Sequence, residues 1–329
     1  MSALGDVAMT IPVIYSLAEQ YPQLEVSVLT SPFFTRLFIH KSTNLRLIEV
    51  DFKGKHKGIK GFFRLFKQLR CFQFSKVADL HNVLRSWIID VFMYLNKAQV
   101  VMVDKKRAQR NYALKHHIRQ PDFISRYAEV FDKLGLPIQI KFTSLFPTGK
   151  NERLPFNVIH PAMGVAPFAR YNNKTYPLEK MEIVVKELTK SGYYIYLFGS
   201  KGNEANKLAL WSQQYERCIL VAGNYPIESE LGIMSQMDVM LTMDSANQHM
   251  AAATNTRVVT LWGSTTPICG FLGYKQSEKD ALFLDLPCQP CSIAGGKRCK
   301  YGHFACMKQL SPEMVVNHLK QIVTIIEIQ

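Results

Sequence analysis

The feature that most constrains the fold is an alternation of apolar and polar segments between residues 239 and 267. Two apolar runs, Val239–Met243 and residues 258–262, are each long enough for one buried strand. Between them lie a short polar turn at residues 244–247 and a helix-forming segment that ends at Ala253. The pattern predicts a strand–helix–strand unit, in which the helix begins at the carboxyl edge of a parallel sheet.

That edge is a candidate ligand site. The free N–H groups at the start of a helix and the positive end of its dipole favour a phosphate or diphosphate. Asp244 or Ser245 can cap this helix, and the turn at residues 264–266 brings three hydroxyls to the same edge. Any one of these residues can be a plain helix cap, and His249 can pack on a helix face. Together, polar residues on two adjacent strand-end loops favour a ligand site.

The remainder of the chain repeats the alternation of strands and helices. Such alternation predicts parallel sheets that are covered on both faces. The 329 residues, 47% of them hydrophobic, are enough for two domains with their own cores. A polar segment at residues 148–152 marks the boundary, so we predict domains at 1–150 and 151–310 and a C-terminal helix at 311–329. The sequence has neither a run of 18 apolar residues nor a secretory signal, and we expect a cytoplasmic protein.

The N-terminus of the chain has an unusual feature. The chain starts on a loop, residues 1–6, which is followed by a predicted helix at residues 7–20. Since a strand normally precedes such a loop, we expect the native product to carry roughly 10 more N-terminal residues that end in a strand.

The second domain is predicted to open with a strand at residues 156–160, followed by a long loop to residue 175. Ser311 caps the last helix, with proline next, and we expect that helix to cross back to the first domain.

The net charge of +14 favours an anionic partner, which can be a phosphorylated substrate, an acidic membrane surface or nucleic acid. No RNA-binding aromatic motif or helix-turn-helix signature is present. Residues 53–70 contain seven Lys or Arg and no acid, with apolar residues at helical spacing. This segment is either a basic amphipathic helix that meets a membrane or an anionic acceptor, or a surface helix that packs its apolar stripe on a sheet. Both hold if the stripe faces inward and the lysines face outward.

Four of the seven cysteines are grouped, with the spacing C-x2-C-x7-C-x6-C. They are Cys288, Cys291, Cys299 and Cys306, and His303 lies between the last two. Four thiols with one C-x2-C pair can form a structural zinc site, although the spacing departs from the standard two-pair ribbon. A cytosolic setting argues against disulfides. A structural zinc ion and reduced free thiols stay open as alternatives.

Five motifs in order resemble glycosyltransferase family 9, the heptosyltransferase-like enzymes of lipopolysaccharide core assembly. They lie at residues 2–7, 174–177, 199–204, 244–249 and 261–267, and the likeness also includes the Asp-Leu-His element at residues 79–81. The resemblance implies an α/β protein with a GT-B fold, in which two Rossmann-like domains face each other across a cleft. It implies that the first domain binds the acceptor and the second binds the nucleotide-sugar.

The resemblance also implies roles for single residues, in a reaction that inverts the anomeric carbon with no metal or other cofactor at the chemistry. Asp6 matches the proposed general base, Lys174 the phosphate-binding lysine, and Glu204 the ribose-binding acid. The other donor-binding candidates are Asp244, Ser245, Ala246, Asn247, His249 and Thr265. The acceptor-binding candidates are Ser2, Gly5, His81 and Arg85. The family usually has glycine at the position of Ala246. Simpler interpretations are a first-turn acid for Glu204, and a solvated lysine and arginine for Lys174 and Arg85.

We therefore expect an inverting glycosyltransferase that moves a heptose-like sugar. ADP-heptose is the best-known donor of the family, and the acceptor is expected to be a lipopolysaccharide-core or related anionic glycolipid at the inner face of the membrane. On this interpretation the enzyme contacts the membrane peripherally and has no nucleic-acid partner. One alternative is a nucleotide-sugar epimerase of the same architecture, which needs a further acid/base set on the donor side. The other is a non-catalytic basic protein that binds anionic lipid or nucleic acid.

Overall fold

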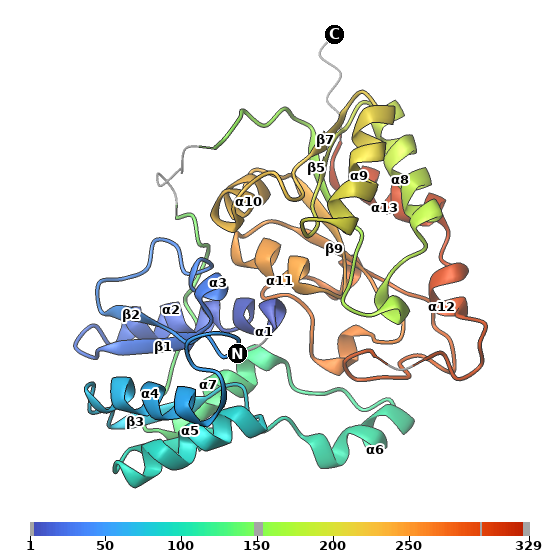
Figure 1. The fold of residues 1–329 in the computed structure, drawn as a ribbon. Coiled ribbons are helices and arrows are strands. Elements are labelled where there is room, and N and C mark those ends of the chain that lie inside the picture. The colour runs from blue at the N-terminus through green and yellow to red at the C-terminus, as the bar shows by residue number, and fades with distance from the viewer. Residues whose placement is uncertain (1–2, 148–153, 297, 325–329) are drawn as a thin grey trace. The chain divides into compact units, whose positions relative to one another are not determined.

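The computed structural model describes residues 3–147, 154–296 and 298–324, and the chain divides into two compact units (Figure 1). The N-terminal unit comprises Met1–Gln109 and Pro121–Thr143, and the C-terminal unit comprises Arg110–Gln120 and Ser144–Gln329. The boundary predicted between residues 150 and 151 lies outside the described residues. Residues 110–120, which the sequence places in the first domain, group with the C-terminal unit.

The C-terminal unit is built on a six-stranded parallel sheet with the order β10-β9-β8-β5-β6-β7. Its strands are β5 (Ala162–Ala166), β6 (Tyr194–Leu197), β7 (Cys218–Leu220), β8 (Val239–Met243), β9 (Val258–Leu261) and β10 (Ala281–Leu282). Every residue of β5, β8 and β9 is buried, as expected for central strands covered on both faces. The predicted strands at 239–243 and 258–262 are confirmed, the second to within one residue.

The prediction for the opening strand of this unit was wrong. Residues 156–160 form no strand, and Ile159 within them is 50% exposed. The strand is β5, inside the predicted loop. Its small residues give a weak strand signal, and the packing explains them: a Cβ on Gly164 would lie 2.0 Å from Sδ of Met240 and 3.0 Å from the ring of Phe198. A central strand therefore needs glycine where the sequence pattern favours bulky β-branched residues.

The C-terminal unit also contains seven helices and three 3-10 turns among its described residues. The helices are α6 (Arg110–Lys115), α8 (Leu178–Lys190), α9 (Asn203–Gln214), α10 (Ile227–Met234), α11 (Ala246–Ala253), α12 (Ala305–Lys308) and α13 (Pro312–Ile322), and the turns are η2 (Asn172–Lys174), η3 (Pro267–Cys269) and η4 (Glu278–Asp280). The predicted cap of α13 is confirmed, because Ser311 accepts a hydrogen bond from the backbone N–H of Met314. The predicted crossing to the first domain stays a prediction. The apolar stripe of α13 packs on α8, within the core of its own unit.

The N-terminal unit contains two separate pairs of parallel strands. One pair is β1 (Val26–Thr30) with β2 (Leu45–Glu49), and the other is β3 (Lys76–Asp79) with β4 (Gln99–Met102). The helices are α1 (Leu4–Ala8), α2 (Ile11–Gln20), α3 (Pro32–Thr35), α4 (Gly58–Arg70), α5 (Leu84–Leu95) and α7 (Phe123–Lys133), with a 3-10 turn η1 (Arg107–Gln109). The expected longer N-terminus stays a prediction.

The predicted helix at residues 7–20 is two helices, α1 and α2. Pro12 lies in the first turn of α2 and has no N–H to donate to the preceding turn, so a continuous helix loses a hydrogen bond there. The hydroxyl of Thr10 instead donates to the carbonyl of Val7 at 2.7 Å and closes the junction. Asp6 therefore lies in the first turn of α1, rather than in a loop.

The basic segment combines both interpretations that the sequence left open. In α4 the apolar stripe faces inward, where Leu65 and Leu69 are buried and the ring of Phe66 stacks on that of Phe92 in α5, 4.1 Å between centroids. The lysines and arginines of residues 53–70 are exposed. Among the helices of the described residues, none is long and apolar enough to cross a membrane.

Candidate functional site

The C-terminal unit has a topological switch point between β5 and β8. From β5 the chain continues to β6 and β7 on one side of the sheet, and β8 leads to β9 and β10 on the other side. Connections that diverge from adjacent parallel strands leave a crevice at the carboxyl ends of these strands, where α/β proteins bind ligands. Lys174 follows β5 and Asp244 follows β8, so two of the predicted donor residues lie at this point.

Lys174 and Asp244 form a nearly buried ion pair. The ammonium nitrogen lies 2.6 Å from Oδ2 of the carboxylate, and the side chains are 12% and 3% exposed. The carboxylate also accepts hydrogen bonds from Thr265 Oγ1 at 2.6 Å and from Gln248 Nε2 at 3.1 Å. Since a lysine ammonium has three donors and Asp244 takes one, Lys174 keeps donors for an anionic ligand. Thr265 is fully buried, and the structure places it against Asp244 as a support of the pair.

Three hydroxyls on the loops that follow β8 and β9 are buried without a hydrogen-bond partner among the residues that the structure describes. They belong to Ser245, which follows β8, and to Ser264 and Thr266, which follow β9. An unpaired buried hydroxyl costs about 1–3 kcal/mol, so such groups rarely persist without a role. Their position at the carboxyl edge of the sheet favours a polar ligand that supplies the missing partners.

The helix start at α11 differs in one respect from the prediction. Ser245 occupies the N-cap position, but its side chain makes no capping hydrogen bond, and the Asp244 carboxylate is engaged by Lys174. The first helical residues, Ala246 and Asn247, are half-buried. Neither predicted cap forms, because the ion pair engages Asp244 and the Ser245 hydroxyl makes no hydrogen bond among the described residues. The eight-residue helix still directs the positive end of its dipole to the edge.

His249 and Glu204 have more limited roles in this geometry. Burial lowers the pKa of His249 to about 4, so the imidazole is neutral at neutral pH and adds no positive charge. Glu204 lies in the first turn of α9, and its Oε2 accepts a hydrogen bond from the backbone N–H of Ser200 at 2.7 Å. This carboxylate therefore orders the turn after β6, at the same edge of the sheet.

A cysteine-rich loop, residues 288–306, packs on the segment that carries Lys174. The backbone N–H of Gly296 donates to the Asn173 side chain at 3.3 Å. A Cβ on Gly295, whose φ is +83°, would lie 2.4 Å from Cδ of Lys174. The loop also joins the strand ends, because the N–H groups of Cys291 and Ser292 both donate to the Ser264 carbonyl at 3.0 Å. The loop thus restricts the path of the Lys174 side chain, which the sequence alone did not indicate.

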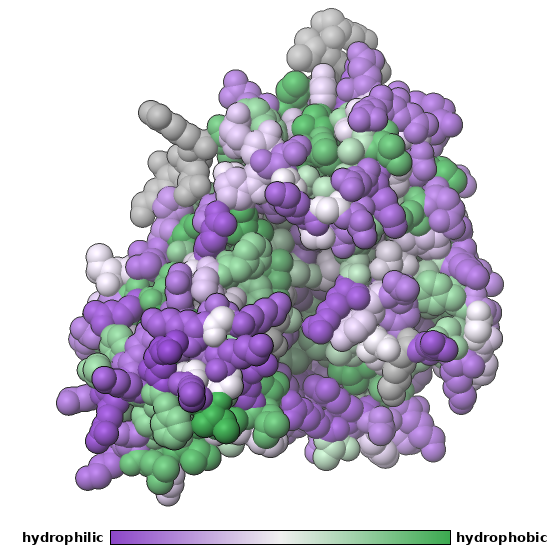
Figure 2. All heavy atoms as spheres, in the orientation of Figure 1, coloured by the Kyte–Doolittle hydropathy of each residue, from purple (hydrophilic) through white to green (hydrophobic). Residues whose placement is uncertain are grey.

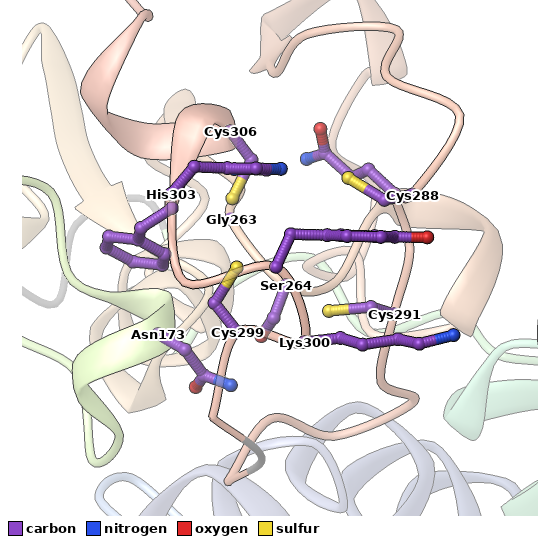
Figure 3. Close-up of a pocket in the computed structure, with 12 residues that line it drawn as sticks. Asn173, Gly263, Ser264, Cys288, Cys291, Cys299, Lys300, His303 and Cys306 are labelled. Atoms are coloured by element: carbon purple, nitrogen blue, oxygen red, sulfur yellow. The ribbon is translucent and has the colours of Figure 1, made fainter.

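The four cysteines of this loop surround one cavity of about 120 Å³ (Figure 3). The figure shows the sulfur atoms of Cys288, Cys291, Cys299 and Cys306 pointing toward a common space. Hydrogen bonds from backbone N–H groups, that of Phe304 first, lower the pKa of the Cys299 thiol. Among residues 3–147, 154–296 and 298–324, no three His, Cys, Asp or Glu side chains are already spaced to hold a metal ion.

The acceptor candidates lie in the N-terminal unit, except that Ser2 is outside the described residues. Gly5 is in α1. The Asp79 carboxylate shapes the turn after β3, since its Oδ1 accepts from the N–H groups of His81 at 2.8 Å and Asn82 at 2.9 Å. Burial lowers the pKa of His81 to about 4, so this histidine is neutral. Arg85 is exposed, and its guanidinium carbon lies 4.6 Å from the centroid of the Phe52 ring.

Asp6 belongs to a group of carboxylates around a buried tyrosine. Burial and then the charge of Asp6 raise the pKa of Tyr127 well above its usual value, and the charge of Asp79 acts in the same direction. Asp79 also accepts a hydrogen bond from the Ser86 hydroxyl at 2.7 Å. Through Tyr127, this group connects Asp6, the candidate base, with Asp79 of the Asp-Leu-His element. The two residues are 73 positions apart in the sequence (6 to 79).

The sequence did not indicate the partner of Asp79 on α5. Asp90 is 8% exposed, and its pKa is raised to about 7 by burial first and then by the charge of Asp79, to which it hydrogen-bonds. Its Oδ2 is buried and has no hydrogen-bond partner in the described part of the chain. Because the raised pKa of Asp90 lies near neutral pH, its carboxyl group holds a proton for part of the time there, beside Asp79.

Comparisons with known proteins identify relatives of the chain. The model of a family described as "Glycosyltransferase family 9 (heptosyltransferase)" matches residues 62–301. Lipopolysaccharide heptosyltransferase 3 of Escherichia coli is 24% identical over 291 residues, which cover 80% of this chain and 82% of that protein. A solved structure of E. coli heptosyltransferase WaaC with ADP has a TM-score of 0.69 at 18% identity and covers 98% of both chains. The structure of E. coli ADP-heptose lps heptosyltransferase II has a TM-score of 0.66 at 19% identity, covering 98% and 96%. These likenesses confirm the predicted GT-B fold class.

The buried Asp79–Asp90 pair predicts a pH dependence of stability. The pKa of Asp90 rises from 3.8 to about 7 on folding, so its contribution to stability is complete below pH ~4 and is lost as the pH rises through 7. Asp90→Asn cannot ionise at this position. We therefore expect its unfolding midpoint, relative to that of the wild type, to be higher at about pH 8 than at about pH 5. Glu230, whose pKa burial also raises to about 7, is present in both proteins and cancels. The same difference in midpoint at both pH values would contradict the assignment.

Proposed function

The chain belongs to glycosyltransferase family 9, and we propose that it transfers a heptose from ADP-heptose to a lipopolysaccharide-core or related anionic glycolipid acceptor. It is a glycosyltransferase by family, and the observation that carries the finer proposal is the Lys174–Asp244 pair with its unpaired hydroxyls. A diphosphate supplies both the negative charge that Lys174 binds and the acceptor oxygens that the hydroxyls of Ser245, Ser264 and Thr266 need.

The names of the relatives support this donor. One solved relative contains ADP, and another is described as acting with ADP-heptose. Glu204 is the candidate for the ribose hydroxyls, with one oxygen already engaged by Ser200. Asn247 and Ala246 are the candidates that lie nearest the start of α11, where backbone N–H groups point to an anion.

In the proposed reaction, the acceptor hydroxyl oxygen forms a bond to the anomeric carbon from the face opposite ADP, and its proton passes to the Asp6 carboxylate. The bond between the anomeric carbon and the diphosphate oxygen breaks, so that the configuration inverts and ADP leaves with its electron pair. Lys174 and the N–H groups at the start of α11 stabilise the charge that grows on the diphosphate. We propose no metal ion at the reacting atoms, because these groups supply the positive charge.

Transfer is favoured over the epimerase alternative by the state of the groups on the donor side. An epimerase needs a base and an acid beside the sugar. Asp244 is engaged by three donors, and burial keeps His249 neutral. Asp244 is held in these bonds, and an imidazole with a pKa of about 4 is a weak base that carries no imidazolium proton to donate, so Asp6 in the N-terminal unit is the candidate base. The acceptor class further implies that the enzyme works in the cytoplasm, at the inner face of the membrane.

We further propose that Cys288, Cys291, Cys299 and Cys306 hold a structural zinc ion. Four thiolates are a ligand set that zinc prefers, and all four sulfurs point to one cavity. Burial first, and then the charges of the other three cysteines, raise the pKa of Cys306 to about 11, so four thiolates need a cation among them. Each sulfur turns on a single side-chain bond, which lets the thiols move to ligand spacing. A metal here would hold residues 288–306 against Lys174.

The proposed reaction predicts ADP release and a role for Asp6. With ADP-heptose and lipopolysaccharide core that ends before the transferred sugar, we expect ADP and a heptose-extended core. Asp6→Asn should lower kcat at least about 100-fold, as expected for loss of a general base. ADP affinity, measured by calorimetry, should stay unchanged, because Asp6 does not contact the donor diphosphate in this mechanism. Asp104→Asn, an exposed acid of the same unit, is the matched control. Full activity of Asp6→Asn would refute the base, and an enzyme that binds ADP but extends no core acceptor would refute the substrate.

The zinc proposal predicts metal in the purified protein. Elemental analysis of protein prepared with zinc should give about one ion per chain, since the site has a single set of four ligands. Cys291→Ser and Cys299→Ser should lose that ion and bind ADP more weakly, because the loop then no longer holds Lys174. Cys71→Ser changes an exposed cysteine outside the loop and should keep it. Four thiols that react with a thiol reagent in metal-saturated protein would support reduced free cysteines instead.

A further inference from the structure

Helix α5 exposes an apolar face that the core does not use. Its buried residues, Ile89, Asp90 and Met93, face inward. The exposed ones follow at helical spacing on the other side: Leu84, Trp87, Ile88, Val91, Tyr94 and Leu95, with Leu84 72% and Leu95 74% exposed. Soluble proteins seldom leave such a contiguous apolar surface uncovered unless it binds a partner.

Helix α4 extends this face and adds positive charge to it. The two helices are neighbours, because Phe66 of α4 stacks on Phe92 of α5. On the outer side of α4, Ile59 is 78% exposed and Phe63 is 69% exposed. The same helix carries four exposed cations and no acid. Figure 2 shows hydrophobic surface at the lower left, over α5, with hydrophilic surface beside it. We call this combined surface of α4 and α5 the α4–α5 face.

We propose that the α4–α5 face docks the protein on the surface of an anionic lipid bilayer. Charge decides between a bilayer and another protein. The only acid on α5 is Asp90, which is buried, so nothing on the face repels an anionic surface. Each lysine or arginine near such a surface is attracted to the lipid phosphates, and exposed apolar side chains enter the boundary between head groups and acyl chains.

The residue types fit the depth at which such a helix lies. Trp87 and Tyr94 have amphipathic rings, which favour the head-group level, while Leu84, Val91 and Leu95 are purely apolar. The cations of α4 can extend their long side chains to lipid phosphates while their apolar stems stay at the boundary. The purpose of this docking rests on the proposed function, because a lipid-anchored acceptor lies at the surface of the bilayer. Lipid binding itself does not depend on transfer.

Tryptophan fluorescence gives a direct test with the full chain. The other two tryptophans, Trp211 and Trp262, are buried in the C-terminal unit, so a change in emission reports Trp87. With vesicles of phosphatidylglycerol and phosphatidylethanolamine, we expect a blue shift and quenching by brominated acyl chains. Vesicles of phosphatidylcholine alone should give neither. Salt should weaken binding to the anionic vesicles, since it screens the α4 cations.

Two paired variants locate the binding to the face, and both change exposed side chains. Leu84→Ser with Val91→Ser should reduce the fraction that sediments with anionic vesicles at least tenfold. Lys60→Glu with Lys67→Glu should do the same and remove the salt dependence. Leu210→Ser, which changes an exposed leucine of the C-terminal unit, is the matched control and should bind like the wild type.

Three outcomes would overturn the proposal. The first is no binding to anionic vesicles, and the second is binding that these variants leave unchanged. The third is a concentration-dependent dimer that Leu84→Ser with Val91→Ser disrupts, because the face is then a contact between copies of the chain. Transfer to a deacylated, soluble core acceptor is measured in parallel. A wild-type protein that transfers sugar to this acceptor but ignores vesicles refutes the docking surface alone, whereas failure to transfer to it bears on the proposed function.

Discussion

The buried ion pair between Lys174 and Asp244 is the interaction on which the rest of the site depends. Placing two charges out of water is costly, and their attraction offsets that cost only where further hydrogen bonds satisfy the remaining atoms. Here Thr265 and Gln248 supply them, one from the loop after β9 and one from α11. Three segments of the C-terminal unit therefore converge on one carboxylate at the switch point of the sheet. A pair of this kind adds little to stability, but it holds an ammonium group ready at the edge where an anion binds.

The backbone around the pair is shaped to let Lys174 reach this position. A Cβ on Gly263 would lie 2.6 Å from the Asn173 carbonyl, so the end of β9 can approach the lysine segment only without a side chain there. Gly295 does the same from the cysteine-rich loop. A structural metal in that loop and a diphosphate at the edge of the sheet would thus act on the same lysine, one by fixing its surroundings and the other by binding its free donors. The orientation of one side chain connects the two proposed ligands.

The sequence predicted those parts of this arrangement that leave a local pattern. Strand β8, the turn after it and helix α11 have sharp changes of polarity, and Ser311 with the following proline marks the start of α13. Strand β5 escaped prediction because close packing against Met240 demands small residues. The pairing of Lys174 with Asp244, and of Asp79 with Asp90, joins residues that no periodicity relates, so only the folded chain reveals their effect on charge. Pro12 and the apolar residues of α5 can be read from the sequence, but which side of each helix is buried depends on the face that the core covers.

The central claim is that Lys174, held by Asp244 and Gly295, binds the donor diphosphate, and the affinity for ADP tests it most directly. Lys174→Met should weaken ADP binding at least about tenfold, as expected for loss of a charge-assisted contact, while the exposed control Lys186→Met should not. Because removing Lys174 leaves Asp244 buried and less well paired, Gly295→Ala provides a second variant that keeps the lysine but displaces it. Gly302→Ala, whose φ of +70° is also left-handed but whose Cβ meets no atom within 4 Å, controls for backbone strain. Of these four variants, the account predicts weak ADP binding for Lys174→Met and Gly295→Ala and wild-type binding for the two controls. Wild-type affinity in folded Lys174→Met protein would contradict it.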